Sequence, residues 1–199
     1  MALQTGPPGC RLLAIPTRDR LVRVLRYVFD EAEFLSPYGI HSLSRAYRDR
    51  PLAVNIRGAT YRVDYEPGES RTWLFGGNAN WRDPVWFPIN YILIEALQRY
   101  HRFYGESLTM EFPTGSGRMM NLDQIARELA RRLISFFLPD AQGRRPAMDG
   151  DARFAKDIYW RELLWFHEYF HGHTGRGLGA SHETGWTCVA ARLIEEFID

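Results

Sequence analysis

Segments with the hydrophobic spacing of amphipathic helices alternate along this chain with loops rich in glycine and aromatic residues. The clearest segment covers residues 86–104, where Ile89, Leu93, Leu97 and Tyr100 recur at helical spacing. Further segments of this kind cover residues 18–30, 122–137, 157–171 and 186–198. With 199 residues, the chain is long enough to bury a core. The pattern therefore predicts an all-α fold whose loops gather at one end.

Local signals define the ends of several of these elements. Thr17 is a candidate N-cap of the first helix, and Asn121 with Gln124 resembles a capping box. Gly105 is expected to end the helix over 86–104. Residues 52–65 instead alternate between apolar and polar positions around Arg57-Gly58, which predicts one small β-hairpin.

Composition limits the classes of partner. The formal net charge is +1, so no overall field attracts nucleic acid or an anionic membrane. No apolar run reaches about 18 residues, so we expect no membrane span. Cys10 and Cys188 are the only cysteines, which favours a reducing compartment and a cytoplasmic location. Residues 1–10 lack the pattern of a signal peptide and are predicted to be a disordered lead-in.

The segment His167-Glu168-Tyr169-Phe170-His171 has two incompatible interpretations. It matches HExxH, in which two histidines on one helical face bind zinc and the glutamate is the general base of a metalloprotease. The longer form of that motif needs a third histidine, and Gly177 stands at its position. Alternatively, Glu168 is the metal-free general base of an inverting glycosidase, which also needs a carboxylic acid elsewhere. Gly177 and Gly179 would then let the backbone approach a sugar closely.

Other polar residues have simpler interpretations. Glu69 follows the hairpin and is interpreted as a solvated carboxylate close to the aromatic loop. His41 is interpreted as a surface or hydrogen-bonded histidine, and Trp160 as a core residue.

Four blocks of the sequence resemble glycoside hydrolase family 63. The longest is Asn80-Trp81-Arg82-Asp83-Pro84-Val85-Trp86-Phe87-Pro88-Ile89-Asn90-Tyr91. The others are Leu74-Phe75-Gly76-Gly77-Asn78, Pro113-Thr114-Gly115-Ser116-Gly117 and Gly179-Ala180-Ser181-His182-Glu183-Thr184-Gly185-Trp186. The resemblance extends from about Arg11 to the end of the chain.

This resemblance implies a function and a site. The family contains α-glucosidases that act on oligosaccharides by an inverting mechanism, without metal or other cofactor, on an (α/α)6 toroid. It implies that Glu168 is the general base. It also implies a sugar pocket formed by Asn80, Trp81, Arg82, Trp86, Gly179, Glu183 and Trp186.

The chain also departs from the family pattern. Asp83 replaces a glycine, and Glu183 replaces a glutamine that is common in bacterial relatives. Both changes add carboxylates beside the inferred site, where they would raise the pKa of a neighbouring carboxyl group. No block resembles the segment that carries the family's general acid.

Residues 11–199 therefore resemble the C-terminal half of such a toroid. We expect the missing N-terminal part of the same enzyme to be a partner, and we expect the isolated chain to be inactive. A non-catalytic helical module that binds carbohydrate or another partner is the remaining alternative.

Overall fold

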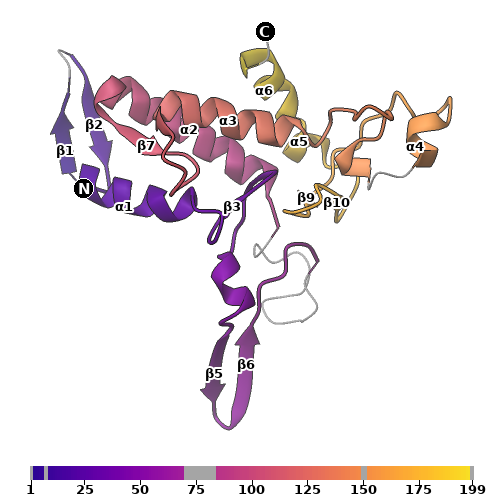
Figure 1. Cartoon of the computed structure of the whole chain (residues 1–199), viewed down its shortest axis with the longest axis horizontal. Coiled ribbons are helices and arrows are strands. Elements are labelled where there is room, and N and C mark those ends of the chain that lie inside the picture. Colours follow the sequence, from indigo (N-terminus) through magenta and orange to yellow (C-terminus); the bar gives the residue numbers. More distant parts are fainter. Residues whose placement is uncertain (1, 7–8, 70–83, 149–151, 198–199) are drawn as a thin grey trace.

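The computed structural model describes residues 2–6, 9–69, 84–148 and 152–197. Four helices form its body, namely α1 (Arg18–Val28), α2 (Phe87–Tyr104), α3 (Leu122–Ile134) and α6 (Ala190–Phe197). In Figure 1, α2 and α3 run side by side through the centre, with α1 along one side and α6 at the other. Two shorter helices, α4 (Ala152–Lys156) and α5 (Thr184–Thr187), and the 3-10 turns η1 (Arg45–Arg48), η2 (Gly105–Ser107) and η3 (Pro146–Met148) complete the helical part.

The prediction of an all-α half-toroid is wrong, because the chain is a mixture of helices and short strands. The described residues form five two-stranded antiparallel sheets between the helices. Their strands are β1 (Ala2–Thr5) with β2 (Arg11–Ala14), β3 (Leu35–Ser36) with β4 (Gly39–Ile40), β5 (Leu52–Ile56) with β6 (Ala59–Val63), β7 (Thr109–Glu111) with β8 (Met119–Asn121), and β9 (Tyr169–Phe170) with β10 (Gly177–Leu178). Strands of two or three residues are too short to produce a period in the sequence. Strand β1 lies in the predicted lead-in.

The capping signals are confirmed. The N–H of Arg20 donates to the hydroxyl of Thr17 at 3.4 Å. At the start of α3, Gln124 N donates to Asn121 Oδ1 at 2.8 Å, and Asn121 N donates to Gln124 Oε1 at 2.9 Å. Helix α2 ends at Tyr104 and Gly105 is its C-cap, as predicted, and Gly105 has a positive φ. These caps satisfy helix-end groups, so the helices begin where the sequence indicates.

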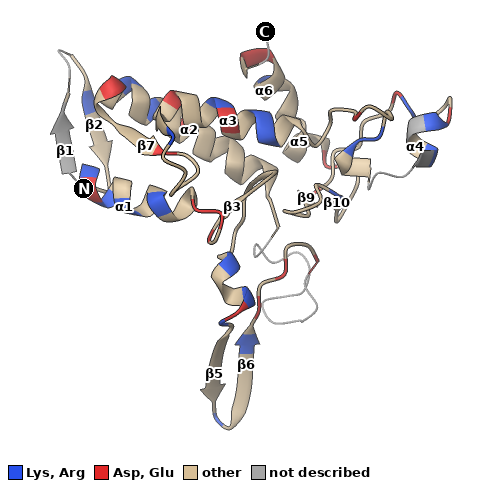
Figure 2. Ribbon diagram, viewed as in Figure 1, with Lys and Arg blue, Asp and Glu red and all other residues tan. Residues whose placement is uncertain are grey.

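The core lies between these four helices. Helix α3 buries residues on adjacent turns, including Leu122, Ile125, Leu129 and Leu133. They pack in one cluster with side chains of α1, α2 and α6. Acidic and basic residues are interspersed along these helices (Figure 2). The surface ion pairs, such as Arg127–Asp123 at 2.9 Å, contribute little to stability.

The predicted β-hairpin is confirmed, and it projects from the body as an arm (Figure 1). Val54 pairs with Tyr61, and Ile56 pairs with Ala59 across the turn. Arg57 and Gly58 both have positive φ, which suits the twist of a two-residue hairpin turn.

The predicted helix over 157–171 is wrong. Residues 158–162 form turns, and the Asp157 carboxylate accepts a hydrogen bond from Tyr159 N at 2.8 Å. Trp160 is 42% exposed, so the interpretation of this residue as core is also wrong. Its ring packs against the neighbouring rings of Phe154 and Trp165, each with centroids 5.6 Å away. An aspartate that bonds the backbone two residues ahead favours a turn over a helix.

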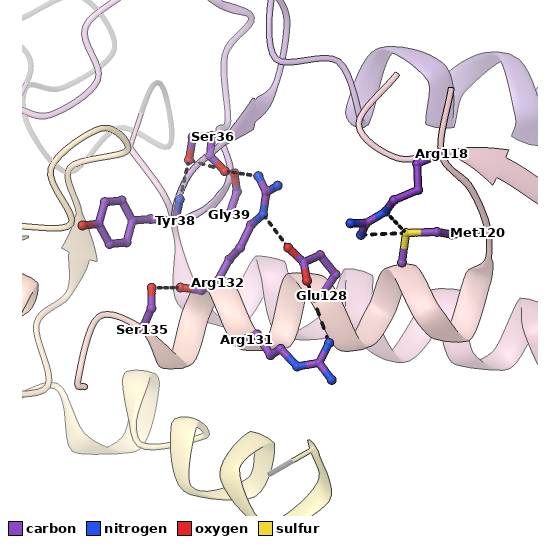
Figure 3. A network of polar contacts seen from close by, with 9 residues as sticks. All are labelled: Ser36, Tyr38, Gly39, Arg118, Met120, Glu128, Arg131, Arg132 and Ser135. Atoms are coloured by element: carbon purple, nitrogen blue, oxygen red, sulfur yellow. Dashed lines mark hydrogen bonds and ion pairs between the residues drawn. The ribbon is translucent and has the colours of Figure 1, made fainter. Parts of the chain in front are cut away.

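The strands β3 and β4 are fixed to α2 and α3 by buried polar contacts. Arg132 of α3 donates to the carbonyl of Ser36 at 2.7 Å and lies 3.6 Å from Glu128, as Figure 3 shows. The buried Asn90 of α2 accepts from Ile40 N at 2.7 Å and donates to Ile40 O at 3.0 Å. These bonds satisfy both backbone groups of Ile40, and they fix the position of the residue that follows, His41.

Val85 connects this region to the C-terminal part of the chain. It forms one antiparallel bridge with His41 and another with Phe170 of β9. Val85 and Phe170 exchange two backbone hydrogen bonds, at 2.9 and 3.0 Å. Three segments distant in sequence are thereby aligned, and Trp86 is brought next to Tyr169. Among the described residues, no helix combines the length and apolar character needed to cross a membrane.

Candidate functional site

Glu168 lies immediately before β9, where two backbone contacts hold it. Its N–H donates to Ala180 O at 2.9 Å, and its carbonyl accepts from the indole Nε1 of Trp186 at 3.0 Å. Its carboxylate Oε2 accepts a longer bond from Ala180 N at 3.4 Å. The side chain is half-buried. The carboxylate is thus held in place and still reaches the surface.

Gly179 forms a close wall against this carboxylate. A Cβ at position 179 would lie 2.6 Å from Glu168 Oε2 and 2.8 Å from Tyr169 Cε1. Gly179 also has a φ of +67°, a conformation that residues with a side chain rarely adopt. Steric contact and backbone conformation both select glycine here.

Three aromatic residues pack together next to Glu168. The rings of Trp86 and Tyr169 have centroids 4.9 Å apart, and Trp86 meets Trp186 edge-on at 6.4 Å. Trp86, Tyr169 and Leu178 form a buried cluster separate from the main core, and Trp186 packs against it. Trp86 and Tyr169 are 2% and 1% exposed, so of these three rings only the half-buried Trp186 can present apolar surface to a ligand.

The structure therefore brings some predicted site residues together around Glu168, namely Trp86, Gly179 and Trp186. Glu183 lies on the exposed N-cap of α5 and is joined to the site through its backbone, which accepts from Trp186 N at 3.0 Å. Asn80, Trp81, Arg82 and Asp83 lie outside the described residues. A separate cavity of about 720 Å³ is lined by Arg153, Phe154, Lys156, Asp157, Trp160 and Trp165.

Sequence reasoning missed Tyr169. Burial, followed by the charges of Glu69 and Glu168, raises the pKa of Tyr169 to about 12. The hydroxyl of Tyr169 is therefore a hydrogen-bond donor over the whole physiological range. Its position next to Glu168 in the sequence could have identified Tyr169 as a candidate site residue.

Tyr65, His41 and His173 form a second group of polar residues near the site. The hydroxyl of the buried Tyr65 lies 3.1 Å from His41 Nε2 and 2.8 Å from His173 Nε2. Gly172 packs on the ring of His41, so closely that a Cβ would lie 1.8 Å from Cε1. His41 is thus buried and hydrogen-bonded, which confirms one of its two interpretations. These contacts join His41 before the arm, Tyr65 after the arm and His173 of the β9–β10 loop.

The structure does not have the geometry that the zinc interpretation requires. Strand β9 separates His167 from His171, so they are not adjacent on one helical face. Four residues of extended chain span about 13 Å, too far for two ligands of one ion. In the parts of the chain that the structure describes, no group of three or more His, Cys, Asp and Glu side chains is arranged to hold a metal ion.

Folding should be less stable in mild acid because two histidines are held neutral. Burial lowers the pKa of His167, as does the charge of His182. Burial also lowers the pKa of His173, followed by the charges of Arg45, His171 and Arg48. The unfolded chain takes up these protons first, so stability present above a pH of about 6.5 is lost as the pH falls below it.

Urea denaturation at pH 7.5 and at pH 5.5 measures this effect. We expect a lower midpoint at pH 5.5, and a smaller difference between the two midpoints in the double variant His167→Gln/His173→Gln. If the double variant showed the same pH dependence as the wild type, the loss of stability could not be assigned to His167 and His173.

Comparisons with known proteins place this site in context. No family model matches the chain. It is 48% identical over 187 residues to the uncharacterized protein YMR196W of Saccharomyces cerevisiae, covering 93% of this chain and 17% of that protein. It is 24% identical over 181 residues to the mannosyl-oligosaccharide glucosidase of Saccharomyces cerevisiae, and 23% identical over 178 residues to a probable mannosyl-oligosaccharide glucosidase of Schizosaccharomyces pombe. Each of these two matches covers 89% of this chain and 15% of the relative.

The similarity to the two glucosidases is distant and extends over most of the chain. It supports a glycosidase-related origin. The chain spans less than a fifth of the length of each of these relatives.

Proposed function

We propose that this chain supplies the general base and part of the sugar-binding surface of an inverting α-glycosidase that acts on α-glucosides in oligosaccharides. The observation that carries the proposal is the setting of Glu168. Glu168 is half-buried, its carboxylate lies beside Gly179 and accepts from Ala180 N, and its backbone carbonyl accepts from the indole of Trp186. The distant similarity to mannosyl-oligosaccharide glucosidases supports the same substrate class.

The chemistry assigned to Glu168 is proton removal from water. The water then attacks the anomeric carbon on the face opposite the leaving oxygen, and the configuration at that carbon inverts. The bond from Ala180 N orients one carboxylate oxygen, and we assign the other oxygen to the water. Gly179 lets the Glu168 carboxylate pack closely against the backbone, and we assign the apolar surface for the sugar to the half-buried ring of Trp186, which packs on the buried Trp86.

Hydrolysis also needs a carboxylic acid that protonates the leaving oxygen. We assign this acid to a part of the enzyme outside this chain. The isolated chain should therefore bind a saccharide without cleaving it, and release of glucose from maltose by the pure chain would contradict this assignment.

Ligand titration tests the role of Glu168. The probes are 1-deoxynojirimycin, a glucose-like amine that is cationic at neutral pH, and maltose, which is neutral. Glu168→Gln keeps the shape of the side chain and removes its charge, so the amine should bind about tenfold more weakly. Glu195→Gln, on the exposed surface of α6, is the control and should bind as the wild type does. Unchanged binding by Glu168→Gln would instead favour a non-catalytic binding module.

A further inference from the structure

Helix α4 and the turns that follow it form a cavity of about 720 Å³, and three aromatic rings line it. The rings of Phe154, Trp160 and Trp165 stand at 65 to 72° to one another, with centroids 4.8 to 5.6 Å apart. Trp160 is 42% exposed, and Phe154 and Trp165 are half-buried. These rings therefore keep apolar surface that a ligand in the cavity can cover.

Charged side chains complete the lining of this cavity. Arg153, Lys156 and Asp157 line it, and all three residues are exposed. They offer hydrogen-bond donors and acceptors next to the rings. The lining carries both signs of charge, so it suits a neutral ligand with several hydroxyl groups better than an ion. A ligand with an apolar face and hydroxyl groups around its edge is a pyranose ring.

An exposed segment connects the cavity to Glu168. The ring of Trp165 meets that of His182, with centroids 6.3 Å apart. His182, Ala180 and Gly179 are exposed. The last two lie against the Glu168 carboxylate, which accepts from Ala180 N at 3.4 Å. Three residue steps of chain span at most about 10 Å, a length that a few linked sugar units cover.

We propose that this cavity binds a further sugar unit of the oligosaccharide whose reacting unit is held at Glu168. The inference rests on the proposed function and adds a site that selects substrate length. A ligand that occupies two sites at once gains affinity from the second without a change in the first. The chain should therefore bind an oligosaccharide of several units more tightly than maltose. A single ring such as 1-deoxynojirimycin reaches one site only, and its charge favours Glu168.

Titration with maltotetraose, a chain of four α-linked glucose units, tests this inference. Trp160→Ala removes an exposed ring of the cavity, so it should weaken maltotetraose binding about tenfold and leave 1-deoxynojirimycin binding unchanged. Tyr159→Ala is the matched control. Tyr159 is a neighbouring ring that is 82% exposed and lies outside the described lining of the cavity. This variant should bind both ligands as the wild type does.

Trp160→Phe separates contact with the sugar from an effect on the fold. Phenylalanine keeps an aromatic ring at this position, so this variant should retain more of the maltotetraose affinity than Trp160→Ala does. If Trp160→Ala instead weakens maltotetraose and 1-deoxynojirimycin to the same extent, the ring acts through the structure of the segment and the inference is overturned.

The remaining outcomes distinguish the inference from the proposed function. If Glu168→Gln weakens 1-deoxynojirimycin binding and Trp160→Ala binds maltotetraose as the wild type does, only the inference on the cavity fails. If the wild-type chain binds neither 1-deoxynojirimycin nor maltotetraose, the proposed function fails and the inference on the cavity fails with it.

Discussion

Replacing Gly172 by alanine is expected to destabilise the chain by about 3 kcal/mol. The new methyl group would lie 1.8 Å from His41 Cε1 and 2.6 Å from its Nδ1. His41 is 3% exposed and is hydrogen-bonded to Tyr65, so the ring has little room to move. The backbone of Gly172 is equally constrained by its bond to Pro67. Urea denaturation followed by circular dichroism measures the loss.

Gly185→Ala is the matched control for this prediction. A Cβ at Gly185 meets no atom within 4 Å, and the residue lies in helix α5, where alanine is favoured over glycine. This variant should be as stable as the wild type or slightly more stable. Equal stability of Gly172→Ala and the wild type would show that His41 does not pack on the β9–β10 loop.

Replacing Gly179 by alanine is expected to reduce both stability and saccharide binding. The added Cβ would meet Glu168 Oε2 at 2.6 Å, Tyr169 Cε1 at 2.8 Å and Glu168 Cβ at 2.9 Å. Rotation of the carboxylate relieves only the first of these contacts. Overpacking and the positive φ together should cost about 3 kcal/mol. Binding of 1-deoxynojirimycin should weaken at least tenfold, because the orientation of Glu168 changes.

Gly115→Ala separates backbone strain from steric contact. Gly115 has a φ of +81°, and a Cβ there meets nothing within 4 Å. This variant should lose about 1 kcal/mol through strain alone and should bind the ligand normally. The contact between Gly179 and Glu168 is contradicted if the two variants behave alike in urea denaturation and in titration.

The sequence predicts the larger elements of this fold well, because their signals are local. Apolar spacing and caps locate α1, α2 and α3 to within a few residues. Arg57-Gly58 similarly marks the turn of the arm. Ladders such as β3–β4 and β9–β10 contain only two pairs each, and contacts with distant residues determine them.

The same difference between local and distant contacts explains which residues of the site can be predicted from the sequence. Glu168, Gly179 and Trp186 are close in sequence and form one local unit, to which the Val85–Phe170 bridge adds Trp86. The structure places these residues together, and their role in binding remains a prediction. His41 reaches the region only through contacts with distant residues, namely its bridge to Val85 and its hydrogen bond with Tyr65. Spacing also misled at residues 157–165, where Leu163 and Trp160 recur at helical intervals in exposed turns.

A crystal structure of the chain soaked with 1-deoxynojirimycin tests the central claim most directly. We predict a sugar ring against Trp186, with an oxygen of the Glu168 carboxylate within about 3.2 Å of the ligand. A ligand bound instead in the cavity lined by Phe154, Trp160 and Trp165, with Glu168 far from it, would contradict the claim.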